Sequence, residues 1–231
     1  MLDLLGDILS PYSEAIGALA GIVATLQSVS GAVFLNDIRK RGSADSFTAT
    51  PFLFGLVIGT LMLKLSLILG QTAMIRTNVV GLVINSVYMA GFYYYTSKEA
   101  LPKLWKQMGI AAAFTSVFII YATFEDPTKI EARYGILLTC MFVMLLSAPL
   151  LSIPEIIRTK SSANLPFPMI LTGTTMGVLW FLHAVSIKNK TLIYQHGFML
   201  LLSSPQLLLC LIYSRTPPKV KDSDDKETKK D

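Results

Sequence analysis

The chain has 231 residues, of which 52% are hydrophobic and only 15% are charged. A soluble domain is usually about 25% charged, so this composition excludes an ordinary soluble protein and predicts an integral membrane protein. The formal net charge of +5 does not indicate nucleic-acid binding, because basic residues of membrane proteins gather in their loops.

Apolar segments recur along the chain at the length of about 20 residues that a membrane-spanning helix needs. Seven segments qualify: Ala15–Leu35, Ala49–Leu69, Ala73–Tyr95, Leu104–Phe124, Tyr134–Ile153, Phe167–Ile187 and Leu192–Tyr213. The gaps between them are short, which predicts a compact all-α bundle. The charged tail at residues 214–231 has two prolines near its start and then charges of both signs, so we expect it to be disordered and cytoplasmic.

The lysines and arginines of the loops predict how the bundle is oriented in the membrane. If the N-terminus is extracellular or lumenal, 14 of the 20 basic side chains face the cytoplasm, 5 face the other side, and Lys64 falls within a span. The five on the other side are Arg76, Lys129, Arg133, Lys188 and Lys190. We therefore expect an extracellular or lumenal N-terminus.

Two stretches of the chain resemble each other at an offset of 118 residues. Asp37 corresponds to Glu155 in this register, and the pairs that follow are Ile38 with Ile156, Lys40 with Arg158 and Ser43 with Ser161. Each triplet has an odd number of spans, so two adjacent triplets would have opposite orientations in the membrane. One extra span between them gives both triplets the same orientation. The pattern predicts two parallel repeats, at 1–95 and 127–213, joined by a linker helix at 96–126, a 3+1+3 arrangement typical of transporters.

Four motifs together resemble the SWEET family of sugar transporters (saliva/nodulin type), which is itself a standard example of parallel three-helix repeats. They are RKRGSADSFTATPF ending at Phe52, RTNVVG at Arg76–Gly81, SAPLL at Ser147–Leu151 and IRTKSSANLPF at Ile157–Phe167. Departures from the family pattern point to an animal member more than to a plant one. The resemblance implies facilitated, bidirectional diffusion of mono- or disaccharides by alternating access, with no cofactor, in the plasma membrane or the Golgi.

The resemblance also implies hinge and pocket residues. A proline is expected on the cytoplasmic side of the first two helices of each triplet, and the four positions hold Gly31, Pro51, Pro149 and Pro166. The pocket pairs an aromatic side chain with an asparagine in each half, and these four positions hold Met62, Asn78, Trp180 and His196. Since Met62 and His196 replace the expected types, we expect an asymmetric pocket.

The chemistry of these side chains suits a sugar, although a purely structural role is an alternative for several of them. Trp180 offers a flat apolar surface, and Asn78 offers both donors and acceptors for hydroxyls. His196 is expected to bond a sugar hydroxyl. Gln27 corresponds to Leu145, which the resemblance places in the pocket, so Gln27 is expected to touch substrate. Polar residues within spans also join helices to each other, and prolines there often only fix a bend.

Lys64 is the costliest residue of the predicted bundle, because a lysine near mid-span costs about 2.5–3.5 kcal/mol to insert. We expect it to line the outer vestibule, and snorkelling towards the membrane surface is an equal alternative. Glu125 and Asp126 are its nearest predicted acidic partners.

Two other functions remain as alternatives. A seven-helix receptor is disfavoured because its signature motifs are absent and the loops are very short. A transporter or sorting receptor of the PQ-loop type is disfavoured because the Pro-Gln pair, Pro205–Gln206, comes late in the last span. The sequence shows no enzyme motif, so we expect a transporter whose partners are a sugar and the lipid bilayer, with a homo-oligomer left open.

Overall fold

The computed structural model describes residues 2–29, 31–150, 153–162 and 167–213, and all of the regular secondary structure in these ranges is helical. Pro166 and the tail at 214–231 lie outside the described residues. The elements are α1 (Leu2–Leu9), η1 (Ser10–Tyr12), α2 (Ser13–Val29), α3 (Gly31–Arg41), α4 (Thr50–Ile68), α5 (Thr72–Tyr94), α6 (Leu101–Phe124), α7 (Ile130–Leu150), α8 (Ile153–Thr159), α9 (Phe167–Ser186) and α10 (Lys190–Ile212).

The helices agree with the predicted spans. Within the described ranges, α4, α5, α6, α10 and the stretch Leu2–Arg41 are long and apolar enough to cross a membrane. The segments predicted for the fifth and sixth spans form α7 and α9. The prediction of an all-α bundle in a 3+1+3 arrangement is confirmed by the likeness to a solved structure given below.

Local chemistry sets several helix ends. Pro51 lies in the first turn of α4, where a missing backbone N–H costs nothing. Gly70 ends the same helix with a φ of +65°, a conformation that favours glycine. The side chain of Asn189 accepts a hydrogen bond of 2.9 Å from the backbone N–H of Leu192 and so caps α10.

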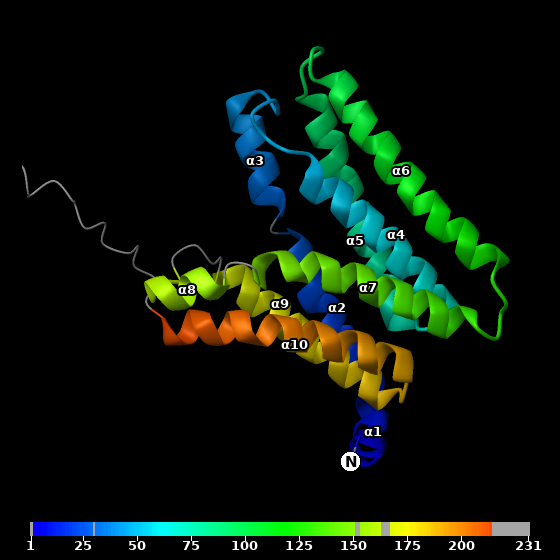
Figure 1. The fold of residues 1–231 in the computed structure, drawn as a ribbon. Helices are drawn as coiled ribbons and strands as arrows, with labels where there is room; N and C mark the ends of the chain where they lie inside the picture. Colours follow the sequence, from blue (N-terminus) through cyan, green and yellow to red (C-terminus); the bar gives the residue numbers. More distant parts are fainter. Residues whose placement is uncertain (1, 30, 151–152, 163–166, 214–231) are drawn as a thin grey trace, which may run out of the picture.

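The two repeats have the same internal packing. The third helix of each lies between the other two, because α5 contacts α2 and α4 while α10 contacts α7 and α9. The repeats meet where α2 packs along α9 and, less extensively, where α4 meets α7, and the linker α6 packs on α4 (Figure 1). We call the end that holds the α4–α5, α6–α7 and α9–α10 turns the Gln71 end, and the opposite end the Arg41 end.

Small residues allow α2 and α5 to approach closely. A Cβ atom built on Gly17 would lie 2.8 Å from Cβ of Ala73, and one on Gly21 would lie 2.5 Å from Oγ1 of Thr77. Gly17 and Gly21 are four residues apart and therefore share one helix face. Within a bilayer, close van der Waals packing of this kind takes the place of the hydrophobic effect between helices.

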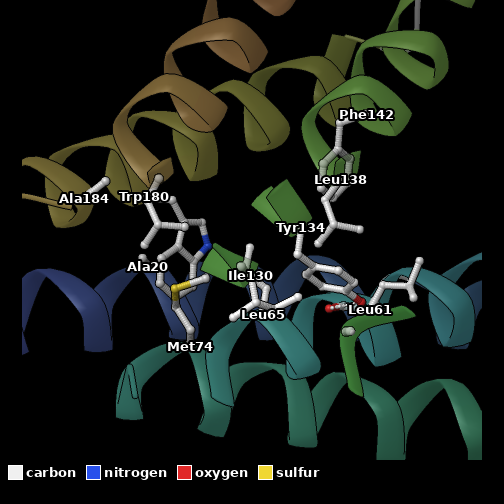
Figure 2. Packing of buried hydrophobic residues seen from close by; sticks show 12 residues of the cluster. Ala20, Leu61, Leu65, Met74, Ile130, Tyr134, Leu138, Phe142, Trp180 and Ala184 are labelled. Carbon is white, nitrogen blue, oxygen red and sulfur yellow. Dashed lines mark hydrogen bonds between the residues drawn. The ribbon is translucent and has the colours of Figure 1, made fainter. Parts of the chain in front are cut away.

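Two buried cores lie at different ends of the bundle. The first lies towards the Gln71 end and joins both repeats and the linker; its members include Ala20 of α2, Leu65 of α4, Tyr134 of α7 and Trp180 of α9 (Figure 2). The second core lies at the Arg41 end, and its buried members come from the first repeat and α6 alone. In Figure 1, α3 and α8 lie well apart at that end. The described contacts between the repeats therefore gather towards the Gln71 end.

The structure differs from the sequence-based spans before the first of them. An additional helix, α1, precedes the segment predicted for the first span and packs on α9. The predicted first span itself is helical in α2 and α3, with residue 30 outside the described residues, and Pro149 lies in α7. Hydropathy could not predict α1, because the packing of α1 on α9 is a tertiary contact.

Candidate functional site

Trp180 lies in the core between the repeats, beside both histidines of the chain. Its side chain reaches from α9 towards Met74 of α5 and Ala20 of α2 (Figure 2), and the residue is 8% exposed. The imidazole of His196 stacks on the indole, with ring centroids 6.3 Å apart and an interplanar angle of 16°. His183 meets Trp180 edge-on, with centroids 5.6 Å apart. The aromatic surface is thus flanked by two nitrogen heterocycles.

Asn78 is held by the first repeat through its amide nitrogen. Its Nδ2 donates to Oγ of Ser66 at 3.0 Å and to the carbonyl oxygen of Met74 at 2.9 Å. Ser66, which is fully buried, donates in turn to the carbonyl oxygen of Met62 at 2.6 Å. Because both amide protons are engaged, the chemistry that Asn78 retains is that of an acceptor, its Oδ1.

Met62 belongs to the same inter-repeat core as Trp180. Its Sδ accepts a contact of 3.7 Å from Nε2 of Gln195, a fully buried residue of α10. Oε1 of Gln195 and Nε2 of His196 have no hydrogen-bond partner within the described structure. Buried polar atoms of this kind usually bond water or a ligand.

Gln27 and Gly31 lie nearer to the Arg41 end. A Cβ atom on Gly173 of α9 would lie 3.9 Å from Nε2 of Gln27, so this amide faces the second repeat. Gly31 begins α3, and a Cβ atom there would lie 2.7 Å from Cε2 of Tyr88. The hydroxyl of Tyr88 donates to the carbonyl oxygen of Val29 at 3.2 Å. Tyr88 therefore contacts both the last residue of α2 and the first residue of α3.

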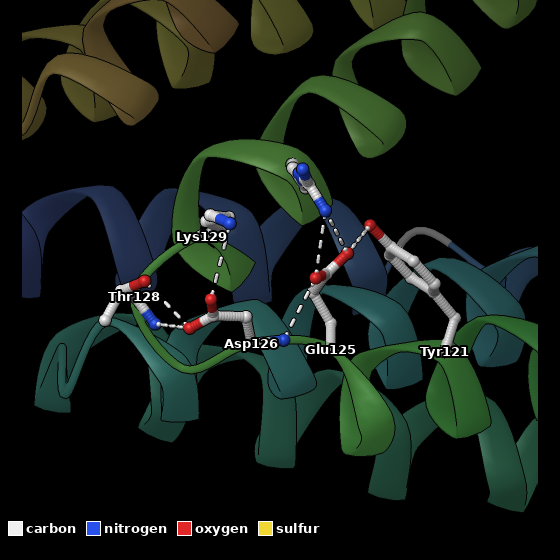
Figure 3. Close-up of polar contacts among 6 residues, drawn as sticks. Tyr121, Glu125, Asp126, Thr128 and Lys129 are labelled. Carbon is white, nitrogen blue, oxygen red and sulfur yellow. Dashed lines mark hydrogen bonds and ion pairs between the residues drawn. The ribbon is translucent and has the colours of Figure 1, made fainter.

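Lys64 does not pair with the acids that the sequence suggested. Arg133 of α7 places Nη1 3.0 Å from both carboxylate oxygens of Glu125, and Lys129 lies 3.5 Å from Asp126 (Figure 3). Lys64 forms no ion pair with any described residue and lies one turn before the end of α4 rather than at mid-span. The predicted partnership of Lys64 with Glu125 or Asp126 is wrong, because Arg133 at the start of α7 and Lys129 in the preceding turn pair with these carboxylates.

The pKa of Glu125 reflects these bonds. The Tyr121 hydroxyl donates at 2.7 Å, and the Arg133 guanidinium and the backbone N–H of Asp126 also donate to the carboxylate. Together they lower the pKa of Glu125 from 4.5 to about 2. Glu125 thus remains charged at neutral pH and fixes the turn between the linker α6 and the second repeat.

Cross-repeat contacts close the Gln71 end. Nδ1 of His183 lies 3.1 Å from the carbonyl oxygen of Ser13, and the absence of a side chain at Gly17 leaves room for the imidazole. In the α9–α10 turn, Lys188 forms an ion pair with Asp7 of α1. These contacts tie the start of the first repeat to the end of α9.

A second set of contacts joins α7 to α4 at the same end. The hydroxyl of the fully buried Tyr134 donates to the carbonyl oxygen of Leu61 at 3.3 Å (Figure 2). Both pairings of helices between the repeats are therefore bonded near the Gln71 end.

Sequence reasoning missed His183, Gln195 and Tyr88. His183 lies three residues after Trp180 and therefore on the same helix face, which was a usable signal. Gln195 precedes His196 in α10, but Met62, which it contacts, belongs to the other repeat, so the local sequence gives no signal of this contact. The described residues contain no group of three or more side chains suited to hold a metal ion.

Comparisons with known proteins agree with the repeat. The family model described as "Sugar efflux transporter for intercellular exchange" (MtN3/saliva) matches the chain twice, at residues 14–100 and 132–218. The second match begins 118 residues after the first, which is the offset between Asp37 and Glu155.

Curated relatives span most of the chain. "Sugar transporter SWEET1" of Drosophila pseudoobscura pseudoobscura is 24% identical over 210 residues, covering 89% of this chain and 90% of the relative. "Bidirectional sugar transporter SWEET12" of Oryza sativa subsp. japonica is 23% identical over 208 residues, covering 89% of this chain and 69% of the relative.

A solved eukaryotic SWEET transporter has the same fold, with a TM-score of 0.77 and 21% sequence identity over 90% of this chain and 100% of that one. These matches favour neither a receptor nor a PQ-loop protein, and they confirm the predicted resemblance. The chain is an integral membrane protein that belongs to the SWEET (MtN3/saliva) family of sugar transporters.

Proposed function

We propose that this protein carries mono- or disaccharides across a membrane by facilitated, bidirectional diffusion. The observation that carries the proposal is the stacked pair of Trp180 and His196 in the core between two repeats, each of which matches the sugar-transporter family model. Relatives from an insect and a plant are named as sugar transporters.

The site suits a sugar in two ways. The face of Trp180 can pack against the C–H face of a pyranose ring, as an aromatic surface does in a site of mixed polarity. Oδ1 of Asn78 can accept from a hydroxyl while its Nδ2 keeps the bonds to Ser66 and Met74. Nε2 of His196, buried and unpartnered, provides a second polar contact on the opposite repeat.

Transport in this proposal proceeds by alternating access between the repeats, which are 1–95 and 127–213, with 96–126 as the linker. The bonded Gln71 end and the separated α3 and α8 support an arrangement that admits sugar from the Arg41 end. Gly31, Pro51, Pro149 and Pro166 are the proposed hinges, and Lys64 is proposed to line the vestibule at the Gln71 end.

The loop charges support a cytoplasmic Arg41 end and an extracellular or lumenal N-terminus. The plasma membrane or the Golgi is the proposed location.

Uptake of radiolabelled glucose, other monosaccharides and sucrose into proteoliposomes tests the proposal. We expect saturable uptake that equilibrates without a proton gradient and does not accumulate when one is imposed. Absence of saturable uptake for every sugar would contradict the sugar-transport function. Gradient-driven accumulation would contradict facilitated diffusion while leaving transport intact.

The site itself is tested by Trp180→Ala, which removes the aromatic surface and is expected to abolish uptake while the protein still reaches the membrane. Trp105→Ala is the matched control, because Trp105 is 56% exposed and contacts Tyr93, away from the inter-repeat core. Near-normal uptake by Trp180→Ala would remove Trp180 from the site.

A further inference from the structure

Two grooves of nearly equal size lie on the membrane-facing surface, one on each repeat. The first, of about 680 Å³, lies between α2 and α5, and the second, of about 660 Å³, lies between α7 and α10. Each of the eleven residues that line the second groove is 118 positions after a residue that lines the first; Cys140, for example, corresponds to Ile22. The grooves are therefore a feature of the repeat.

The second groove runs from the Gln71 end towards the middle of the membrane. On α7 it extends from Ala132 to Met144, which at about 1.5 Å per residue is ~18 Å. Half of a bilayer's hydrocarbon core is about 15 Å thick, so the groove matches the depth of one leaflet. Ile136 and Met144, which line it, are 63% and 76% exposed, as expected of side chains that face lipid.

Each groove has one cation and one carboxylate near its mouth. Glu14 and Arg76 line the first groove. Lys190 lines the second, and Glu131 lies beside it, where its Oε1 accepts from Nδ2 of Asn189 at 2.8 Å. A phosphate next to the lysine and an ammonium next to the carboxylate would satisfy both charges.

We propose that these paired grooves are binding sites for zwitterionic phospholipids of the leaflet at the Gln71 end. In the α7–α10 groove, one acyl chain lies along α7, the phosphate meets Lys190, and the choline or ethanolamine group meets Glu131. A lipid can occupy each groove separately, whereas a two-fold contact between the α7–α10 grooves of two copies covers only one groove on each chain. The proposal concerns the membrane-facing surface and does not depend on sugar transport.

Photolabelling tests the second groove on the full chain. Phosphatidylcholine with a diazirine in its acyl chain is incorporated into nanodiscs with the protein, and labelled residues are identified by mass spectrometry. We expect labels to concentrate on the groove between residues 136 and 144, relative to Val117, which is 65% exposed on α6 and does not line the groove. Lys190→Gln should lower the groove label about fivefold, the scale of one lysine–headgroup contact.

Arg76→Gln is the matched control, because it removes the cation of the other groove at the same membrane end and should leave the α7 label unchanged. Equal labelling of Val117 and the groove, or no effect of Lys190→Gln, would show bulk lipid alone and overturn the proposal. A second copy in the groove would also overturn it. That outcome would appear as a disulfide between Cys140 of two copies after oxidation, with little lipid label in the groove.

Discussion

At the scale of single residues, the candidate site is unequal in its two halves. The first repeat holds Asn78 through Ser66, whose hydroxyl joins the amide to the carbonyl of Met62. In the second repeat the position that corresponds to Ser66 is Ala184, which has no hydroxyl group that could hold His196. The polar group in the first repeat is therefore fixed by hydrogen bonds, while that in the second is fixed by stacking on Trp180.

Ser66→Ala tests this support. It leaves one proton of Asn78 without its acceptor, so the amide is free to turn away from the sugar. We expect KM for the transported sugar to rise about two- to tenfold, the range of one hydrogen bond, with the maximal rate largely kept. Thr115→Ala is the control, because that hydroxyl bonds the carbonyl of Ala111 on α6. An unchanged KM would show that Ser66 does not position Asn78.

At the scale of helices, two local features join segments that are proposed to move relative to each other. Tyr88 packs against Gly31 of α3 and donates to the carbonyl oxygen of Val29 at the end of α2. The Glu125–Arg133 pair fixes the turn between α6 and α7. Each ties a proposed hinge or the proposed linker to a neighbouring helix, so each can be tested without changing the candidate sugar site.

Gly31→Ala should impair the first of these features. The new methyl group would lie 2.7 Å from the Tyr88 ring and must displace it, which destabilises a packed site by about 1–3 kcal/mol. We expect a lower unfolding temperature and a slower maximal transport rate, both recovered by adding Tyr88→Leu. Gly81→Ala is the control, since a Cβ there meets nothing within 4 Å. Equal effects of the two alanines would exclude a special role for Gly31.

Glu125→Gln should make the unfolding temperature less dependent on pH in the acidic range. The folded pKa of about 2 lies below the ordinary 4.5, so the stabilisation by ionised Glu125 is present above pH 4.5 and is lost as the pH falls towards 2. The unfolding temperature of Glu125→Gln should therefore be lower than that of the native chain at pH 5–7, and the difference should shrink below pH 4.5. Glu99→Gln, in the α5–α6 turn, should show no such difference. A difference in unfolding temperature between the native chain and Glu125→Gln that stays constant down to pH 3 would contradict this role of Glu125 in the turn.

Sequence could predict the spans and their repetition because hydropathy and the 118-residue offset are local or periodic signals. It could not predict that Glu125 binds Arg133 rather than Lys64, because the choice depends on which cation the turn brings near. His183 illustrates the same limit: its partner Ser13 is 170 residues away and belongs to the other repeat. The roles of Gly31, Pro51, Pro149 and Pro166 as hinges remain predictions.

At the scale of the whole molecule, the two ends of the bundle differ. Contacts of α1 and α2 with α9, and of α7 with α4, join the repeats near the Gln71 end. The buried core at the Arg41 end belongs to the first repeat and α6 alone among the described residues. Alternating access requires the first set of contacts to separate when the site opens in the other direction.

Cross-linking at the Gln71 end tests this central claim most directly. Cysteines replace Asp7 and Lys188, which form an ion pair across the repeats, in a chain whose Cys140 and Cys210 are changed to alanine. A short thiosulfonate cross-linker then joins them in proteoliposomes, with Asp7→Cys alone as the control. We predict that cross-linking stops uptake of labelled sugar and that a reducing agent restores it. Undiminished uptake by the fully cross-linked protein would contradict alternating access between these repeats.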